Sequence, residues 1–463
     1  MRAQGLNVER PEIGERLGAP GRRALGATSR TSVAFTVDCE RVLTVVLLLQ
    51  LVASAVMVGV MGLRSPGNAH PDELLHFRAG QYFREHWLPP PVGAPEAATT
   101  YSWYGMSYLD QGDIVYWALG KATALGKRLG LAPAAAMRWF QLSLYWGLVV
   151  WMIFRARAFM PALGFLLLTP QVWYVFSYIN GDALPFALLT VVLVELGWPD
   201  SGVRSFLSGT QARPGVGVLV IAAAIGLLAV SKLNYLVSIV FVGWAFLWLR
   251  GETRWRRAAL IALVAAAIAL PWATYHSWVN DFHTGQKILE YAEKAAVPDL
   301  KPSAQASSMT FPLVALRAKG VPLWAILVKS DWVGLSFRSF CGFYGWMSIE
   351  GPPWLYQIFG GLYAGLLAIL ILPAVLRGSP RVWILVTGVV VCATLVLGQS
   401  VYRSWVFDFQ GQGRYLFPIL PMLFFYWRQC EATALRLPAL VVVALLGGLG
   451  LLSFALIGLG SLA

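Results

Sequence analysis

Residues Val42–Met61, VLTVVLLLQLVASAVMVGVM, decide the fold class of this chain. The run contains no charged residue, and it is long enough for a helix to cross a bilayer, which takes about 20 apolar residues. Similar runs recur to the end of the sequence, and only 13% of the 463 residues are charged. An average soluble protein carries about 25% charged residues. The composition therefore predicts a polytopic membrane protein and excludes disordered, collagen-like and disulfide-stapled chains.

The apolar runs predict an all-α, polytopic transmembrane bundle of about 11 (10–13) spans. The expected spans are 42–61, 135–154, 161–178, 183–197, 215–231, 234–249, 258–275, 356–376, 382–399, 413–427 and 438–458. They form one integral membrane domain, 42–463. The residues before it, 1–41, are polar and rich in arginine, and we expect them to form a disordered cytoplasmic tail.

The distribution of Lys and Arg sets the orientation. Positive charge is denser in the loops that are cytoplasmic when the N-terminus is inside, which favours that topology and an outer C-terminus. Two large loops, 62–134 and 276–355, then lie outside. Within them, Asp113–Arg128, Val321–Val328 and Val333–Phe343 are too short to span and are predicted to be helices that lie on the membrane surface.

The first outer loop opens with a motif of acidic residues and histidine, Asn68-Ala-His-Pro-Asp-Glu-Leu-Leu-His-Phe-Arg78. A proline followed by acidic residues is typical of a helix start, and this helix is expected to run to about Trp87. On it, Asp72 and Glu73 lie on the same side as His76. Such a group suits a general base or a divalent cation, Mg²⁺ or Mn²⁺. The alternative interpretation is structural: the acidic residues cap the start of the helix, and this face of the helix is exposed to solvent.

Three further polar clusters stand at predicted span ends on the same outer side. Asp182, which follows Asn180, is either a helix cap or a functional carboxylate. Lys232 and Arg414, the latter followed by Tyr415, either extend to the membrane surface or bind a lipid phosphate. Two acidic and two basic clusters on one face indicate a glycosyl-transfer site. In such a site the acidic residues act on an acceptor hydroxyl, and the basic residues bind a lipid phosphate.

The arrangement resembles the GT-C superfamily of membrane glycosyltransferases and, more closely, the bacterial membrane proteins grouped as domain of unknown function 2142. The resemblance runs from about Val42 to Ile457. The segments that carry it are Pro71–Phe77, Asn180–Ala183, Lys232, Ser336–Trp346 and Gly413–Pro418. The chain has Leu74 and Leu233 where members of that family have proline, which affects the local backbone and removes no charge.

The resemblance implies a GT-C-like fold in the bacterial cytoplasmic membrane and an inverting transfer of sugar from a polyprenyl-phosphate donor at the outer face. The expected acceptor is an envelope glycan, lipid or protein, and no nucleic acid is involved. Carried over to this sequence, the base or metal-binding residue is Asp72 or Glu73, with His76 orienting the carboxylate. Lys232 and Arg414 hold the donor phosphate. The remaining expected site residues are Tyr415 at the phosphate, and Asn180, Asp182 and Arg78 at the substrate.

Other functions fit parts of the pattern. A polymerase of lipid-linked glycans needs arginines in the large outer loop, and loop 276–355 contains only Arg317 and Arg338. A transporter or flippase for lipid-linked saccharides predicts charges at mid-span and internal repeats, but Glu195 is almost alone inside the spans. A scaffold protein predicts that Asp72 is freely replaceable.

Overall fold

The structure, a computed structural model, describes residues 25–156, 164–249, 254–304, 315–430 and 436–462. The chain forms two compact units, Met1–Val42 and Leu43–Ala463. In the first unit, the described residues form the beginning of helix α1 (Leu25–Arg64). The expected disordered tail, 1–41, is therefore helical from Leu25 on, where the sequence contains no proline; its residues 1–24 lie outside the described part.

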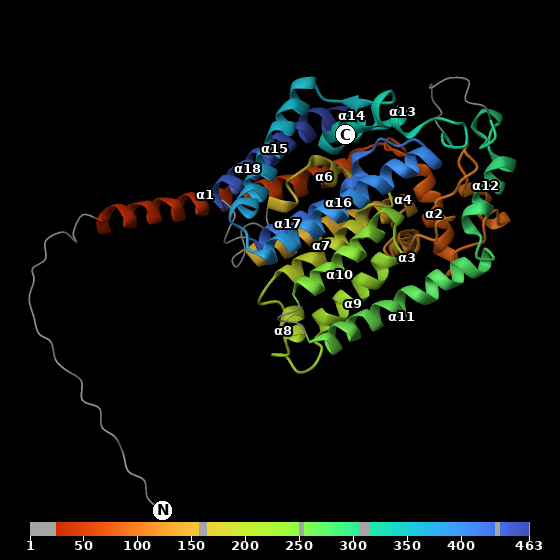
Figure 1. Ribbon diagram of the computed structural model, residues 1–463. Coiled ribbons are helices and arrows are strands. Elements are labelled where there is room, and N and C mark those ends of the chain that lie inside the picture. The colour runs from red at the N-terminus through yellow and green to blue at the C-terminus, as the bar shows by residue number, and fades with distance from the viewer. Residues whose placement is uncertain (1–24, 157–163, 250–253, 305–314, 431–435, 463) are drawn as a thin grey trace, which may run out of the picture. The chain divides into compact units, whose positions relative to one another are not determined.

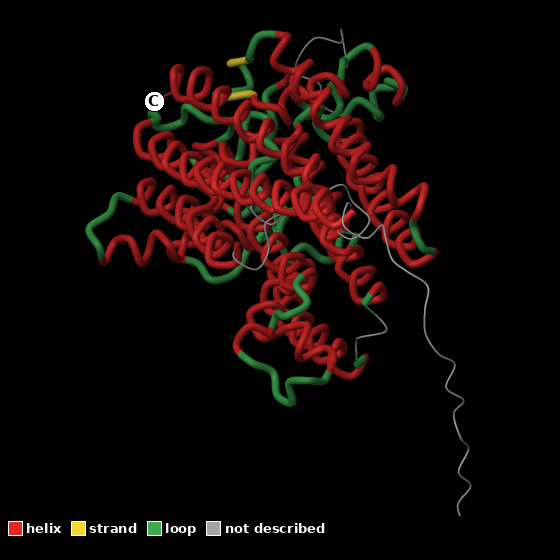
Figure 2. Tube along the Cα trace, turned by 90° about the vertical axis from the view of Figure 1, so that its left-hand side faces the viewer, coloured by secondary structure: helices red, strands yellow, loops and turns green. Residues whose placement is uncertain are grey.

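The second unit is almost entirely helical (Figures 1 and 2). After α1, the α-helices of its first half are α2 (Glu73–Glu85), α3 (Ile114–Arg128), α4 (Pro133–Ala156), α6 (Pro170–Phe176), α7 (Ala183–Gly197), α8 (Gly202–Ser208), α9 (Val216–Ala229) and α10 (Leu236–Trp248). Those of its second half are α11 (Trp255–Val279), α12 (Thr284–Ala295), α13 (Leu323–Val328), α14 (Trp332–Gly342), α15 (Pro353–Arg377), α16 (Pro380–Val406), α17 (Ile419–Gln429), α18 (Arg436–Ser453) and α19 (Gly460–Leu462). Short helical turns are η1 (Pro95–Thr100), η2 (Leu233–Tyr235), η4 (Pro298–Leu300), η5 (Gly413–Leu416) and η6 (Phe454–Leu459).

Five helices of the described chain are long and apolar enough to cross a membrane, or six if the bent pair α7 and α8 counts as one span. The five are Cys39–Arg64, Trp255–Val279, Pro353–Leu376, Pro380–Val406 and Arg436–Leu462. A count of about 11 spans is not confirmed, because several predicted spans are short helices. Helix α7 has 15 residues, α9 has 14 and α10 has 13, so each is at most about 22 Å long at 1.5 Å per residue.

The expected span 161–178 is wrong as a continuous helix. Residues 157–163 lie outside the described part, and the chain then makes a turn before α6, which has only 7 residues. Thr169 caps α6 by accepting a hydrogen bond from the Gln171 N–H, and Pro170 takes the first helical position. Every residue of α6 is buried. Irregular backbone is tolerated inside a membrane protein where protein surrounds it, and here it breaks what hydropathy alone reads as one span.

The helices predicted in the two large loops are present. Helices α2 and α3 pack against each other and against α4. The bounds of α13 and α14 agree within two residues with the predicted helices Val321–Val328 and Val333–Phe343. Between α14 and α15, the two-residue strands β1 (Phe343–Tyr344) and β2 (Ile349–Glu350) pair antiparallel and are drawn in yellow in Figure 2.

Helix α7 lies at the centre of the second unit, enclosed by α4, α9, α10 and α17 (Figure 1). Nearly all of its side chains are buried, which is typical of a helix that is apolar on every side. Helix α7 begins at Ala183, directly after Asp182, and η2 begins directly after Lys232. The fold therefore places Asp182 and Lys232 directly before the starts of helical segments.

Candidate active site

Asp72 lies directly before α2 with its backbone in the left-handed region, at φ 57°. Its carboxylate makes no capping hydrogen bond to the helix, so a cap is not its role. Capping falls to Asn68, whose side-chain oxygen accepts a hydrogen bond from the Leu74 N–H at 3.3 Å. The Asp72 carboxylate instead accepts a hydrogen bond of 2.9 Å from the hydroxyl of Tyr108, and it is only partly buried. The carboxylate is thus oriented by a tyrosine and free of its own helix.

His76 does not orient Asp72, contrary to expectation. Its Nδ1 shares a hydrogen bond of 2.8 Å with the Tyr116 hydroxyl, and its ring stacks on Tyr108 with 3.9 Å between ring centroids. Burial, followed by the positive charges of Arg414 and Lys232, keeps the pKa of His76 well below its ordinary value. The imidazole is therefore neutral, and Tyr108 stands between it and the carboxylate.

The start of α7 separates the roles of Asn180 and Asp182. The Asn180 side-chain oxygen accepts hydrogen bonds from the backbone N–H groups of Asp182 (2.8 Å) and Ala183 (3.2 Å), so Asn180 caps the helix. Both residues are fully buried. The Asp182 carboxylate makes no capping bond and accepts hydrogen bonds from the Lys232 ammonium through both oxygens, each at 2.8 Å. Asp182 is a partner of the basic residues, and Asn180 is structural.

Arg414 and Tyr415 complete this charged group. The Arg414 Nε lies 3.7 Å from Asp182 Oδ2, and its guanidinium stands over the Tyr415 ring at 5.7 Å from the centroid. The Lys232 ammonium stands over the same ring at 4.9 Å. Two cations, Lys232 and Arg414, pair with the Asp182 carboxylate, and the buried Asp113 carboxylate lies within electrostatic reach of Lys232. Lys232, Arg414 and Tyr415 are therefore brought together, as expected of an anion site.

The hydrogen-bonding state of Arg414 differs sharply from that of Arg138. A guanidinium has five N–H donors, and Arg138 uses its own in five hydrogen bonds, two to Glu73 and three to the backbone carbonyls of 62, 65 and 66. Within the described chain, the Arg414 guanidinium makes one hydrogen bond, to the Tyr178 hydroxyl at 3.4 Å, and its Nε has none, although only 5% of the residue is exposed. A buried cation with unmet donors is costly unless a ligand supplies acceptors.

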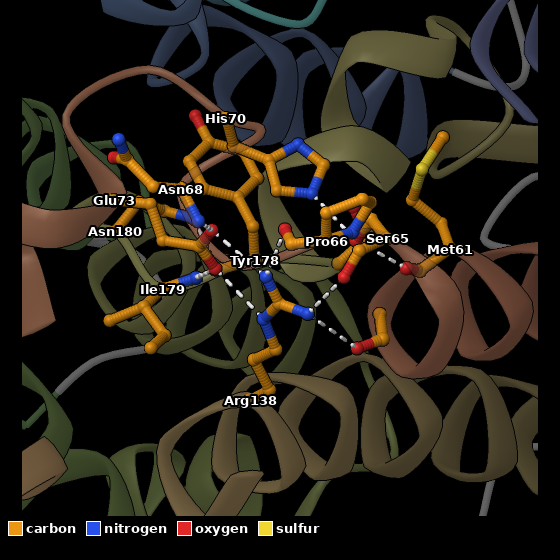
Figure 3. Close-up of polar contacts among 12 residues, drawn as sticks. Met61, Ser65, Pro66, Asn68, His70, Glu73, Arg138, Tyr178, Ile179 and Asn180 are labelled. Carbon is orange, nitrogen blue, oxygen red and sulfur yellow. Dashed lines mark hydrogen bonds and ion pairs between the residues drawn. The ribbon is translucent and has the colours of Figure 1, made fainter. Parts of the chain in front are cut away.

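Figure 3 shows the Glu73 carboxylate facing the Arg138 guanidinium, which rises from α4. The carboxylate also accepts hydrogen bonds from the backbone N–H groups of Asn68 (3.0 Å) and Ile179 (3.3 Å). Glu73 is 3% exposed. Its oxygens are therefore used to tie together the end of α1, the start of α2, α4 and the segment before α7. Glu73 therefore makes structural contacts through both oxygens, and its expected role as the base stays a prediction.

The residues considered for a divalent cation do not form a site for one. Glu73 is occupied by Arg138, and Asp72 is held by Tyr108. Across the described ranges, no three His, Cys, Asp or Glu side chains are grouped so that they could hold a metal ion. Because Mg²⁺ and Mn²⁺ need several oxygen ligands, this donor set does not fit a resident ion.

Arg78 lies apart from the charged group. Its guanidinium donates to the Thr99 backbone carbonyl at 3.1 Å, and within the described chain it makes no contact with Asp72 or Asp182. Arg78 therefore does not join the Asp182, Lys232 and Arg414 group, and its expected role at the substrate stays a prediction. Asp72, Asp182 and Arg414 each lie within electrostatic reach of Tyr178.

Several residues of the site were not singled out in the sequence. Tyr108, Tyr116 and Tyr178 are three of 17 tyrosines, and no spacing sets them apart. Asp408 is buried, which raises its pKa to about 6, and it accepts a hydrogen bond from the Gln410 amide at 2.7 Å. Gln410 in turn accepts a hydrogen bond from the Tyr415 hydroxyl. The sequence signal that could have identified this loop is the position of Asp408, an acidic residue shortly before Gly413–Tyr415.

Replacing Asn180 by alanine should lower the stability of the protein by about 2 kcal/mol, because the cap of α7 and the buried bonds of Asn180 to Val175 and Tyr178 are lost. Thermal unfolding in detergent measures the effect. Ser201→Ala is the matched control, since Ser201 caps the peripheral helix α8 and should cost about half as much. Equal melting temperatures for Asn180→Ala and the wild type would contradict the capping role.

Comparison with known proteins identifies the family. The family model described as "Predicted membrane protein (DUF2142)" matches residues 94–423, which include Asn180, Lys232 and Arg414 but not Asp72. No curated protein matches the chain.

Two crystal structures of ArnT from Cupriavidus metallidurans are distantly similar to this fold. The apo structure is 18% identical with a TM-score of 0.36 and covers 89% of this chain and 77% of its own. The structure bound to undecaprenyl phosphate is 16% identical with a TM-score of 0.34 and covers 91% of this chain and 77% of its own. Similarity this distant transfers neither residues nor activity. The family model, which spans most of the sequence, confirms the expected relationship: the chain belongs to the DUF2142 family of membrane proteins.

Proposed function

We propose that this protein is a GT-C-type glycosyltransferase that moves a sugar from a polyprenyl-phosphate-linked donor to an envelope glycan, lipid or protein acceptor. The observation that carries the proposal is the buried guanidinium of Arg414, which lies beside Lys232 and whose Nε has no hydrogen-bond partner in the described chain. The planar fork of arginine matches the oxygens of a phosphate. The family resemblance of Gly413–Pro418 and Lys232 supports the same assignment.

The transfer is a single displacement. The oxygen of an acceptor hydroxyl attacks the anomeric carbon of the sugar, and the bond from that carbon to the phosphate oxygen breaks. The electron pair leaves with the polyprenyl phosphate, and the Asp72 carboxylate takes the proton of the hydroxyl. Attack opposite the leaving phosphate inverts the anomeric centre.

The chain contributes positioning and charge to this reaction. Tyr108 holds the Asp72 carboxylate, and Asp182 fixes the Lys232 ammonium through both oxygens. Lys232 and Arg414 stabilise the charge that develops on the leaving phosphate, and they need little reorganisation because they are held in place before reaction. No step requires a metal ion. In the proposed topology, the site faces the outside of the bacterial cytoplasmic membrane and the N-terminus is cytoplasmic.

Arg414→Ala should weaken the binding of undecaprenyl phosphate to the purified protein by at least tenfold, because the principal donors to the phosphate are removed. Arg128→Ala is the matched control: Arg128 is exposed at the end of α3 and should leave affinity unchanged. Equilibrium binding in detergent micelles measures both variants.

Two outcomes would contradict the proposal. If Arg414→Ala and the wild type bind undecaprenyl phosphate with equal affinity, Arg414 does not form the phosphate site. Binding of undecaprenyl-phosphate-linked sugars without transfer to any of a broad set of acceptors would instead indicate a flippase or transporter for the same lipids.

A further inference from the structure

Two buried histidines stand in the first loop, and they differ in one respect. Both nitrogens of His70 are hydrogen-bonded, Nδ1 with the Tyr174 hydroxyl and Nε2 with the Ser65 hydroxyl, each at 2.8 Å. His76 is equally buried, at 1% exposed, and its Nδ1 is likewise bonded to a tyrosine, Tyr116. Its Nε2, however, has no partner in the described chain. A buried polar atom of this kind normally has a water or ligand partner, because leaving it unpaired is costly.

His76 contacts a tyrosine on each side of the site, Tyr108 and Tyr116. One face of its ring stacks on Tyr108, whose hydroxyl holds Asp72. Its other contact, Tyr116, has its hydroxyl next to Gly181, which directly precedes Asp182. The charges of Arg414 and Lys232 also act on the imidazole. His76 is therefore linked to the Asp72 side of the site through Tyr108 and to the Asp182 side through Tyr116.

The chemistry of Nε2 selects the kind of group that it binds. The hydrogen on Nε2 depends on the tautomer, which the Tyr116 contact leaves open. A hydroxyl both donates and accepts, so it satisfies either tautomer, whereas a phosphate oxygen satisfies only the one with a hydrogen on Nε2. The imidazole is neutral, so it offers a hydrogen bond and no charge to the ligand.

We propose that Nε2 of His76 binds a hydroxyl of the sugar carried by the lipid donor, which makes His76 a specificity-determining residue. This inference rests on the proposed function and assigns the sugar-recognising part of that site. It separates sugar recognition by His76 from phosphate recognition by Arg414 and from proton transfer by Asp72.

The test compares two kinds of lipid in the absence of an acceptor. Equilibrium binding to the purified full-length protein is measured for undecaprenyl phosphate and for the same lipid linked to glucose, galactose or arabinose. His76→Asn should lower affinity for the best-bound sugar-linked lipid about fivefold to tenfold and leave affinity for undecaprenyl phosphate unchanged. The asparagine amide lies close to the place of Nδ1 and retains the Tyr116 contact. His76→Gln, whose amide reaches the place of Nε2, should recover part of the loss.

His70→Asn is the matched control, because His70 is a buried histidine with no unmet nitrogen. This change should lower the melting temperature and leave the difference between the two lipids as in the wild type. An equal loss of affinity for both lipids in His76→Asn, or no loss for either, would overturn the assignment of His76. The proposed function would still stand if the wild type binds these lipids. Failure of the wild type to bind either lipid would overturn both.

Discussion

Replacing Asp72 by asparagine is expected to reduce sugar transfer at least a hundredfold while the protein folds and inserts as the wild type does. The loss follows from removal of the general base, whose contribution is typically 10²–10⁴-fold. The substitution should remove the charge of Asp72 without disturbing the backbone or the hydrogen bond from Tyr108. Asp72 has a left-handed backbone, at φ 57°, and asparagine adopts this conformation at least as readily as aspartate. The side-chain oxygen of the introduced asparagine also accepts the hydrogen bond from Tyr108.

The measurement is transfer from an undecaprenyl-phosphate-linked sugar by purified protein, with melting temperature and undecaprenyl phosphate affinity as controls. Both controls should match the wild type, because Asp72 makes no ion pair within the described chain and does not cap α2. Asp72→Ala should lose transfer equally and also lose some stability, since alanine tolerates the left-handed backbone poorly. Wild-type turnover by Asp72→Asn would remove the base from this position.

The sequence predicted the helical membrane fold and singled out Asp182, Lys232 and Arg414, which the structure brings together, but it did not single out Asp408. Long uncharged runs predict membrane helices wherever a helix crosses unbroken, as in α15 and α16. Hydropathy cannot show where a buried chain stops being helical. Residues 164–176 are mostly apolar and buried throughout, yet the backbone turns before Pro170, because the surrounding protein satisfies groups that lipid would leave unpaired.

The roles of neighbouring residues depend on partners that are distant in the sequence. Asp72 and Glu73 have the same chemistry and adjacent positions, and spacing assigned both to one patch. In the structure, Glu73 meets Arg138 of α4, while Asp72 meets Tyr108. His76 shares a face with Asp72 but bonds to Tyr116 of α3. Local spacing predicts which residues are near one another, whereas the packing of α2 on α3 and α4 decides which of them are free to react.

Neutralising the adjacent carboxylate, Glu73, should therefore lower the stability of the protein, whereas neutralising Asp72 should lower sugar transfer. Glu73→Gln is expected to destabilise the protein by about 3–5 kcal/mol, because it leaves the Arg138 charge, 12% exposed, without its counter-charge in a buried site. The glutamine amide also places an N–H donor where Arg138 or the Ile179 backbone N–H needs an acceptor. The effect appears as a lower melting temperature in detergent and a lower yield of folded protein.

A double-mutant cycle separates this structural role from a chemical one. Arg138→Met removes the buried cation, so adding Glu73→Gln to it should cost much less than Glu73→Gln costs alone, with a coupling energy of about 2–3 kcal/mol. The folded fraction of Glu73→Gln should still bind undecaprenyl phosphate, because Arg414 and Lys232 do not touch Glu73 within the described chain. A Glu73→Gln protein with the wild-type melting temperature and no transfer would reverse the assignment. The general base would then be Glu73, and the bond from Tyr108 to Asp72 would be the structural one.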